Sequence, residues 1–172
     1  MLTHKSRRFL ENKRIMIIGG AGSIGSELAR QVYKINPNIC IWDNNESGLF
    51  DITQELSGTT PLLADIRDIQ EVVKYLTQYK PDIIYHCGAY KHVPLLEQFP
   101  EAAMKNNIQG TQNILITASK LGIKKVVFIS TDKAVEANCI MGKTKAIGES
   151  MCQKVSGSSK TKCIVVRFGN VL

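Results

Sequence analysis

Short apolar runs alternate with longer stretches of helical periodicity along the whole chain, and this alternation limits the fold more than any other feature. The runs are four to six residues long and lie at 14–18, 39–42, 61–64, 83–86, 125–129 and 163–168. Runs this apolar favour strands that are buried on both faces. Because strands that alternate with helices form parallel sheets, the sequence predicts an α/β fold.

Helices are predicted between these strands, at 23–35, 47–56, 69–79, 100–121 and 141–155. Gly122 and the Lys80-Pro81 step lie where two of these helices should end. Right-handed crossovers would give a doubly wound (Rossmann) sheet with strand order 3-2-1-4-5-6, in which ligands bind at the carboxyl ends of the strands. No linker or repeat divides the chain, so we expect residues 1–172 to form a single domain.

Charge alone leaves several partners open. Lys plus Arg number 22 and Asp plus Glu number 15, and the net charge of +7 would suit a nucleic acid, an acidic membrane surface or a phosphorylated ligand. Part of the basic excess lies in the first fourteen residues. We interpret this segment as a solvated N-terminal arm in preference to an anion-binding patch.

The location of the protein follows from features that the sequence lacks. No apolar run approaches the roughly 18 residues that span a bilayer, and no secretory signal opens the chain. The five cysteines are widely spaced, with no Cys-x-x-Cys pair and no nearby His at metal-ligand spacing. We therefore expect a cytoplasmic protein without a membrane span, with free thiols and no metal site.

A glycine-rich segment joins the first predicted strand to the first predicted helix. Residues 19–25 read GGAGSIG and fit both G-x-G-x-x-G and G-x-x-G-x-x-G. Glycines permit a tight turn and close approach of the backbone, and a helix N-terminus offers N–H groups to a pyrophosphate. The segment predicts dinucleotide binding by Gly19, Gly22, Ser23, Ile24 and Gly25. The alternative is a tight strand-to-helix turn without a ligand.

Acidic residues follow the second and third strands. Asp43 stands eighteen residues after Gly25, where a carboxylate would accept hydrogen bonds from the adenosine ribose. Its charge would repel a 2′-phosphate and therefore favours NAD over NADP. Asp65 and Ile66 lie where the adenine edge would pass. Each Asp has an alternative role as a cap of the next helix, which for Asp43 begins near Glu46.

A second polar segment follows the fifth strand. Thr131, Asp132 and Lys133 come directly after a buried run, so a hydroxyl, a carboxylate and an amine would face the cofactor together. An Asp beside a Lys can act as acid and base in one elimination, provided that burial shifts their pKa values toward the working pH. The alternative is a surface ion pair in a turn.

Several segments together resemble one enzyme family. They are 19–28 (GGAGSIGSEL), 86–96 (HCGAYKHVPLL) with Glu97, Asn107-x-x-Gly110-Thr111, 130–135 (STDKAV), 141–145 (MGKTK) and 167–172 (RFGNVL). From about residue 12 onward, the chain resembles the nucleotide-sugar 4,6-dehydratases of bacterial polysaccharide biosynthesis (CapD-like), a branch of the extended short-chain dehydrogenases. The pattern is most similar to the UDP-N-acetylglucosamine 4,6-dehydratases, including the inverting ones that also epimerise C5.

This resemblance implies an NAD-dependent, redox-neutral dehydration of a UDP-linked N-acetylhexosamine to its 4-keto-6-deoxy derivative. In the family, hydride leaves C4, the C5 hydrogen becomes acidic, water leaves from C6 and the hydride returns to C6. The resemblance assigns Lys133 as the base at C5 and Asp132 as the acid at the C6 hydroxyl. Thr131 would then hydrogen-bond the C4 oxygen, and Lys145 would hold the nicotinamide ribose.

Other site residues are implied by position in the same family pattern. Asn107 corresponds to the Asn of the active-site helix, and Gly88 with Ala89 would pass near the nicotinamide half of the cofactor. The resemblance also places three residues, Lys91, His92 and Asn170, in segments that face the sugar and its diphosphate.

Two departures from the family pattern bear on catalysis. Met141 stands where most short-chain dehydrogenases have Tyr, and a thioether cannot take a proton from the C4 hydroxyl. Asp132, Lys133 or a bound water would have to substitute, and the alternative role for Met141 is packing. Family members also continue for well over a hundred residues beyond the 167–172 segment. We therefore expect the substrate-binding portion to be absent here and the shortened sheet to self-associate as a homo-oligomer.

Three other functions stay open. The chain is an NAD-binding module without catalysis if the substrate-binding portion is required. A UDP-sugar 4-epimerase is the nearest enzymatic rival, because only Asp132 and Lys133 favour elimination over oxidation and reduction at C4. A nucleic-acid-binding domain would explain the charge, but the sequence shows no aromatic stacking positions and no recognition motif, so we expect no nucleic-acid partner.

Overall fold

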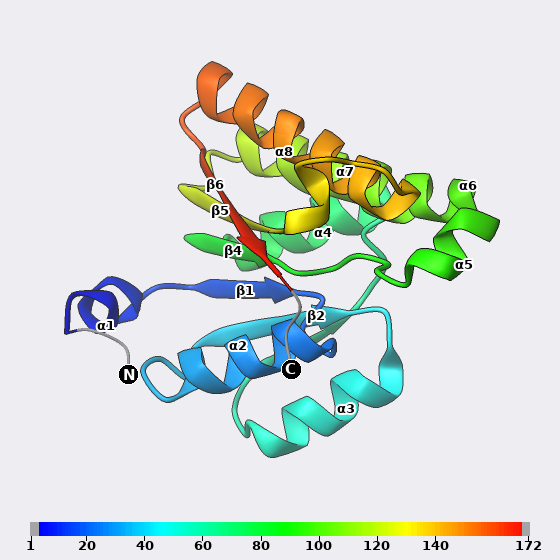
Figure 1. Ribbon diagram of the computed structural model, residues 1–172. Coiled ribbons are helices and arrows are strands. Elements are labelled where there is room, and N and C mark those ends of the chain that lie inside the picture. Colours follow the sequence, from blue (N-terminus) through cyan, green and yellow to red (C-terminus); the bar gives the residue numbers. More distant parts are fainter. Residues whose placement is uncertain (1–3, 170–172) are drawn as a thin grey trace.

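Six parallel strands form one sheet in the computed structural model, which describes residues 4–169 (Figure 1). The strands are β1 (Ile15–Ile18), β2 (Ile39–Asp43), β3 (Thr60–Leu63), β4 (Ile83–His86), β5 (Lys125–Thr131) and β6 (Lys162–Phe168). Their order is β3-β2-β1-β4-β5-β6, and every neighbouring pair is parallel. The predicted doubly wound α/β fold and its strand order are therefore confirmed.

Helices cover both faces of the sheet because alternate side chains of each strand point to opposite faces. Helices α2 (Ser23–Tyr33) and α3 (Glu46–Glu55) lie on one face, and α4 (Ile69–Tyr79), α7 (Gly110–Lys120) and α8 (Ile140–Ser158) lie on the other (Figure 1). In β1, Ile15 and Ile17 belong to the core under α2 and α3, whereas Met16 and Ile18 belong to the opposite core. The predicted central strands are thus buried on both faces.

The edge strands depart from that expectation. In β3, Leu63 is 53% exposed, and in β6, Ile164 is 44% exposed. An edge strand has a neighbour on one side only, and fewer helices reach over it, so its apolar run does not guarantee burial. Within residues 4–169, no helix combines the length and the apolar character that a bilayer span demands.

The predicted single helix at 100–121 is three segments in the structure. A short α6 (Pro100–Ala103) leads into a π-helix, η1 (Met104–Gln109), and the chain continues as α7. The wider π-helical turn lets two adjacent side chains, Asn106 and Asn107, both be buried. A further helix, α5 (Val93–Gln98), precedes α6 and was not predicted, because Pro94 hides its short periodicity.

The N-terminal arm is also more ordered than the sequence suggested. It contains helix α1 (His4–Leu10), whose last residue, Leu10, is only 6% exposed. The side-chain amide of Asn36 donates to the carbonyl oxygens of Leu10 (2.7 Å) and Lys13 (2.8 Å). Residues 7–9 are exposed, as expected of a solvated arm, but Leu10 and the bonds from Asn36 fasten the end of the segment to the start of the sheet.

Candidate active site at the carboxyl edge of the sheet

A cleft of about 230 Å³ opens at the carboxyl ends of β1, β2 and β4. Six of the predicted cofactor-binding residues line it: Gly19, Gly22, Asp43, Ile66, Gly88 and Ala89. The sequence did not single out the rest of the lining, which is Ile18, Ala21, Trp42, Asn44, Asn45, Ala64, Cys87, Tyr90 and Asn106. The cleft therefore lies where the strand order reverses, as the fold class predicts.

The glycine-rich loop is held against both neighbouring strands. Gly19 has a φ of +77°, and a Cβ on it would collide with the backbone of Gly88. A Cβ on Gly25 would overlap the carbonyl oxygen of Gly19. The N–H groups of Gly19 and Gly20 donate to the Trp42 carbonyl at 2.8 and 3.1 Å. These contacts explain why glycine is required, and the loop leads directly into α2.

The N-terminus of α2 is suited to an anion. Its N-cap, Gly22, has no side chain with which to satisfy the first N–H groups of the helix. Ser23 and Ile24 are the first residues of α2, and the positive end of the helix dipole is therefore directed toward the cleft side of the loop. A pyrophosphate is the group that such an arrangement binds in dinucleotide-binding folds.

Asp43 connects the second strand to the glycine-rich loop through a hydrogen bond to Ala21. Its carboxylate accepts from the backbone N–H of Ala21 at 2.9 Å and from that of Asn45 at 3.0 Å. The cap of α3 is Asn45, whose side-chain oxygen accepts from Gly48 N–H at 3.2 Å. The alternative that Asp43 caps this helix is therefore wrong, and the carboxylate lines the cleft.

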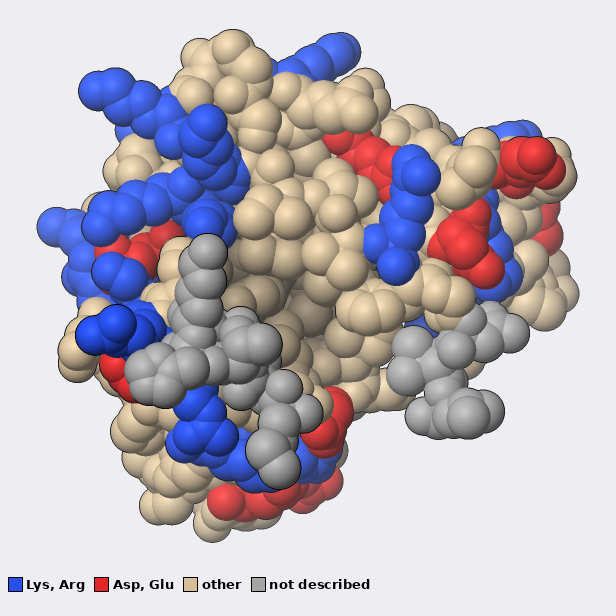
Figure 2. Space-filling view, turned by 60° about the vertical axis from the view of Figure 1, so that its left-hand side comes forward, with Lys and Arg blue, Asp and Glu red and all other residues tan. Residues whose placement is uncertain are grey.

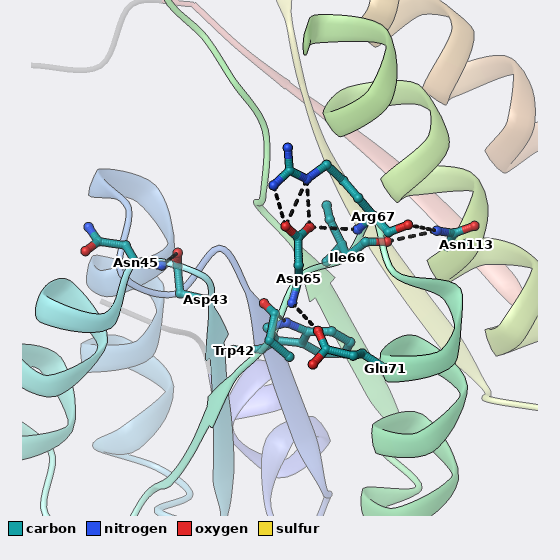
Figure 3. A network of polar contacts seen from close by, with 9 residues as sticks. Trp42, Asp43, Asn45, Asp65, Ile66, Arg67, Glu71 and Asn113 are labelled. Carbon is teal, nitrogen blue, oxygen red and sulfur yellow. Dashed lines mark hydrogen bonds and ion pairs between the residues drawn. The ribbon is translucent and has the colours of Figure 1, made fainter.

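Asp65 turns toward an arginine instead of capping a helix (Figure 3). Its carboxylate is paired with Arg67, which accounts for a pKa of Asp65 below the usual value. The cap of α4 is Asp68, which accepts from Gln70 N–H at 2.8 Å. Ile66 does line the cleft, and its backbone carbonyl accepts from Asn113 at 3.0 Å. Asp65 itself is not among the cleft-lining residues.

The loop after β4 passes the glycine-rich loop closely. Cys87 N–H donates to the Ile18 carbonyl at 2.8 Å, which extends the β1–β4 pairing to the cleft. Lys91 lies with its ammonium 3.4 Å from the Ser23 hydroxyl, at the start of α2. His92 is the exposed residue that precedes α5, and Asn170 lies outside the described residues.

Asn107 is a buried connector between three elements. Its side-chain oxygen accepts from Tyr90 N–H at 2.8 Å, and its amide donates to the Tyr90 carbonyl and to the Thr144 hydroxyl, both at 3.0 Å. Neighbouring Asn106 also donates to it at 3.1 Å. These bonds tie the π-helix to the loop after β4 and to α8. The side chain thus fixes the walls of the cleft, while Asn106 lines it.

The polar segment after β5 forms a turn on the surface. Asp132 accepts from the Thr131 hydroxyl at 2.9 Å, from Lys133 N–H at 2.8 Å and from the Lys133 ammonium at 3.3 Å. The Thr131 bond and the Lys133 ammonium lower the pKa of Asp132. Its side chain is 58% exposed. The burial that acid–base chemistry required at this position is therefore not provided by residues 4–169.

Lys145 is the buried cation of the site, with 8% of its surface exposed. Its ammonium donates to the Ile129 carbonyl at 2.7 Å and lies 4.7 Å from the centre of the Phe128 ring. Burial lowers the pKa of Lys145 to about 8. His86 packs against the same ring and is also buried, and burial lowers its pKa to about 3. An amine with this pKa exchanges protons near neutral pH.

A carboxylate that the sequence did not single out lies one helical turn after Lys145. Glu149 is 7% exposed and accepts from the Ser130 hydroxyl at 2.6 Å. Arg167 on β6 donates to both of its oxygens, at 2.9 and 2.6 Å. Arg167, chiefly through these bonds, holds the pKa of Glu149 below the usual value. The network joins α8, β6 and the residue immediately before Thr131.

Met141 occupies an apolar cluster with Leu96 and Ala103 and is 6% exposed. This is the packing role that the sequence left open for it. The next residue, Gly142, lies so close to the turn after β5 that a Cβ on it would collide with the Lys133 carbonyl. Helix α8 thus begins against the turn that carries Asp132 and Lys133, which brings Lys145 and that turn to one edge of the sheet.

Similarity to known proteins extends over almost the whole chain. The sequence model of the family described as "Polysaccharide biosynthesis protein" matches residues 15–172. The capsular polysaccharide biosynthesis protein CapD of Staphylococcus aureus is 42% identical over 96% of this chain and 29% of its own length. The inverting UDP-N-acetylglucosamine 4,6-dehydratase of Campylobacter jejuni (strain 81-176) is 30% identical over 93% of this chain and 49% of its own length.

Solved structures share the fold. The structure of Pen from Bacillus thuringiensis matches with a TM-score of 0.89 and 33% identity, over 95% of this chain and 52% of that protein. The UDP-Glc/GlcNAc 4-epimerase of Campylobacter jejuni matches with a TM-score of 0.82 and 26% identity, over 91% of this chain and 53% of its own. The chain thus spans half or less of the length of the two relatives named above and just over half of these two structures. It belongs to the polysaccharide biosynthesis protein family, within the short-chain dehydrogenase fold.

Proposed function

We propose that the protein is, or forms the cofactor-binding half of, an NAD-dependent dehydratase that converts a UDP-linked N-acetylhexosamine to its 4-keto-6-deoxy derivative. The observation that carries the proposal is the turn of Thr131, Asp132 and Lys133 at the same sheet edge as the cleft. An adjacent acid and amine are what an elimination of water needs, whereas oxidation and reduction at C4 alone do not require them.

The residues around the cleft fit a dinucleotide. The glycine-rich loop packs so closely that Gly19 and Gly25 cannot carry side chains. Because no side chain stands at these positions, a pyrophosphate could come close to the loop backbone and the start of α2. Asp43 would accept hydrogen bonds from the adenosine ribose and would repel a 2′-phosphate, which favours NAD over NADP. A bound nicotinamide would supply reversible hydride transfer. While C4 is a ketone, the neighbouring C5 proton would be acidic.

The remaining chemistry falls to side chains of this chain. Thr131 would donate a hydrogen bond to the C4 oxygen, Lys133 would take the proton from C5, and Asp132 would protonate the departing C6 hydroxyl. In the ion pair Asp132 is ionised and Lys133 is an ammonium. Transfer of one proton from the Lys133 ammonium to Asp132 would give both the acid for the C6 hydroxyl and the neutral amine that takes the C5 proton. Buried Lys145 would orient the nicotinamide ribose and supply positive charge. The exposed Lys91 and His92 lie on the loop that would face the sugar diphosphate.

A 4-epimerase is the second candidate. The 26% identical epimerase of Campylobacter jejuni supports it, as does the exposure of Asp132, because a solvated carboxylate with a lowered pKa is a weak acid catalyst. The third candidate is NAD binding without turnover, since the relatives continue well beyond the part that this chain matches.

One experiment separates the three. The protein is incubated with NAD⁺ and UDP-N-acetylglucosamine in deuterated water and followed by proton NMR. A dehydratase yields a new C6 methyl signal with deuterium at C5, and an epimerase yields the C4 epimer with no methyl signal. An unchanged sugar spectrum, together with NAD⁺ binding by calorimetry, identifies a binding module. Gly25→Val serves as the control that removes cofactor binding. Lys133→Met serves as the control that should lose both the C5 deuterium and the C6 methyl signal while NAD⁺ still binds, because Lys133 does not line the cleft.

A further inference from the structure

Basic side chains gather at the edge of the sheet where the strands begin, opposite the cleft. All six strands are parallel, so the residues before each strand lie at this one edge. Figure 2 shows Lys and Arg concentrated on the left-hand side of the molecule. From their places in the chain, the cations at the strand-start edge lie in α1, at or just after the ends of α2, α4 and α7, and before or at the starts of β1, β5 and β6: Arg7, Arg8, Lys13, Arg14, Lys34, Lys80, Lys120, Lys124, Lys125, Lys160 and Lys162.

This surface, which we call the basic edge, carries almost no compensating charge. Its acidic residues are Glu11, Asp82 and, at the end of α3, Glu55; Asp82 is paired with Lys124 at 2.9 Å and Glu55 with Arg30 at 2.7 Å. The eleven named cations outnumber these three carboxylates by eight, which exceeds the net charge of +7 of the whole chain. The positive excess of the chain is therefore concentrated at the basic edge.

The basic edge is also hollowed and partly apolar. A cavity of about 260 Å³ opens between the ends of α4 and α7, and Arg14, Lys80 and Lys124 line it together with apolar side chains such as Leu121. Leu121 and Phe9 are each 43% exposed. The Lys125 ammonium lies 4.2 Å from the centre of the Phe9 ring, which joins α1 to the start of β5. Cations mixed with exposed apolar groups are typical of surfaces that meet lipid headgroups.

We propose that the basic edge docks peripherally on a membrane surface rich in anionic phospholipid. A nucleic acid fits the observations less well, because α1, the helix that lies beyond the strand starts at this edge (Figure 1), has only seven residues and is short for a groove-reading helix. The exposed Phe9 is already covered on one side by Lys125 and offers no stacking platform. Docking by the basic edge leaves the cleft, at the opposite edge of the sheet, facing the solution.

Vesicle flotation tests this proposal with the whole chain. The protein should float with phosphatidylcholine vesicles that contain phosphatidylglycerol and not with vesicles of phosphatidylcholine alone, and added salt should release it. Each Lys or Arg near such a surface strengthens binding roughly 5-fold. The triple variant Arg8→Glu, Lys120→Glu, Lys160→Glu changes three exposed side chains and should weaken partitioning by roughly 100-fold or more.

A matched variant carries the same change of net charge elsewhere. Lys74→Glu, Lys105→Glu and Lys143→Glu lie on helices outside the basic edge and should leave at least a tenth of the vesicle binding intact. Equal loss in both triple variants would overturn the proposal, because it would show a response to net charge alone. Failure to float with anionic vesicles would overturn it too, as would displacement from them by an equal phosphate concentration of duplex DNA. None of these outcomes depends on turnover or on NAD binding.

Discussion

Two lysine–carboxylate pairs lie near the same sheet edge, and their surroundings differ sharply. Asp132 and Lys133 form an ion pair in a surface turn, with side chains 58% and 41% exposed. Lys145 and Glu149 lie one turn apart on α8 and are 8% and 7% exposed. The first pair is held by contacts within three consecutive residues, and the second by partners from β5 and β6.

This difference shows that burial, more than proximity, changes what a lysine can do. The exposed pair favours the ionised form of Asp132, because the Thr131 hydroxyl and the Lys133 ammonium lower the pKa of that carboxyl group. In the buried pair, loss of solvation lowers the pKa of Lys145 to about 8. The two pairs therefore predict opposite responses to mutation and to pH.

The largest effect is expected at Glu149. Glu149→Ala removes charge-assisted bonds to Ser130 and Arg167 at a nearly buried position and should lower the free energy of unfolding by about 3 kcal/mol. For a domain of this size, that corresponds to a fall in Tm of roughly 6–12 °C. Scanning calorimetry of Glu149→Ala beside Asp132→Ala checks the comparison. Equal Tm values for the two variants would show that the buried network contributes no stability.

A smaller effect is expected from the titration of Lys145. Its folded pKa of about 8 lies below its ordinary value of 10.5, so between these limits the unfolded chain holds a proton that the folded chain has lost. The free energy of unfolding should therefore rise with pH in this window, by roughly 2 kcal/mol. Lys145→Met lacks this contribution. Urea unfolding of both proteins from about pH 7.5 to 10 measures it, and a constant difference would contradict the assignment.

A finer test uses the direction in which the pKa of Lys145 shifts in two variants. Glu149→Gln removes a negative charge near Lys145 and should lower the pKa of the amine further, whereas Arg167→Gln removes the counter-charge of Glu149 and should raise it. Cys87, Cys152 and His86 also face Lys145 and are unchanged in both variants. NMR titration of the Lys145 side chain reports the two shifts. Shifts of the same sign would mean that the network acts only through packing.

The smallest effect is expected at the exposed pair. Asp132→Asn should leave Tm within about 1 °C of the parent protein, because exposed ion pairs contribute little to stability. NAD⁺ affinity should also be unchanged, since Asp132 is not among the residues that line the cleft. Differential scanning fluorimetry and calorimetric titration measure both quantities. A large loss of Tm would show that the turn is a structural element and not a solvated one.

Sequence reasoning was most successful where a pattern has one structural solution. The alternation of apolar runs and helices, with glycines at 19, 22 and 25, leads to the observed strand order and to the loop beside the cleft. It was less successful in choosing between neighbouring polar residues. Asn45 and Asp68, not Asp43 and Asp65, cap the following helices, because the capping side chain must reach an N–H group two or three residues on.

Other features had no usable signal in the sequence. The π-helix at Met104–Gln109 follows from burying two adjacent asparagines, and its periodicity within a helical stretch is too short to detect. Glu149 and Arg167 lie eighteen residues apart, on a helix and on an edge strand. No local pattern marks them as partners. The one available hint is that Glu149 lies four residues after Lys145, on the same face of the predicted helix.

The sequence by itself therefore determined the fold, the strand order and the edge of the sheet at which the candidate site lies, because periodicity and glycine placement are local properties of the chain. Only the tertiary structure decided which charges are buried. Lys145 and Lys133 cannot be distinguished by residue type, yet packing against Phe128 removes water from one and leaves the other solvated. Desolvation depends on neighbours that are distant in the chain, and so does the gathering of eleven cations at the opposite edge.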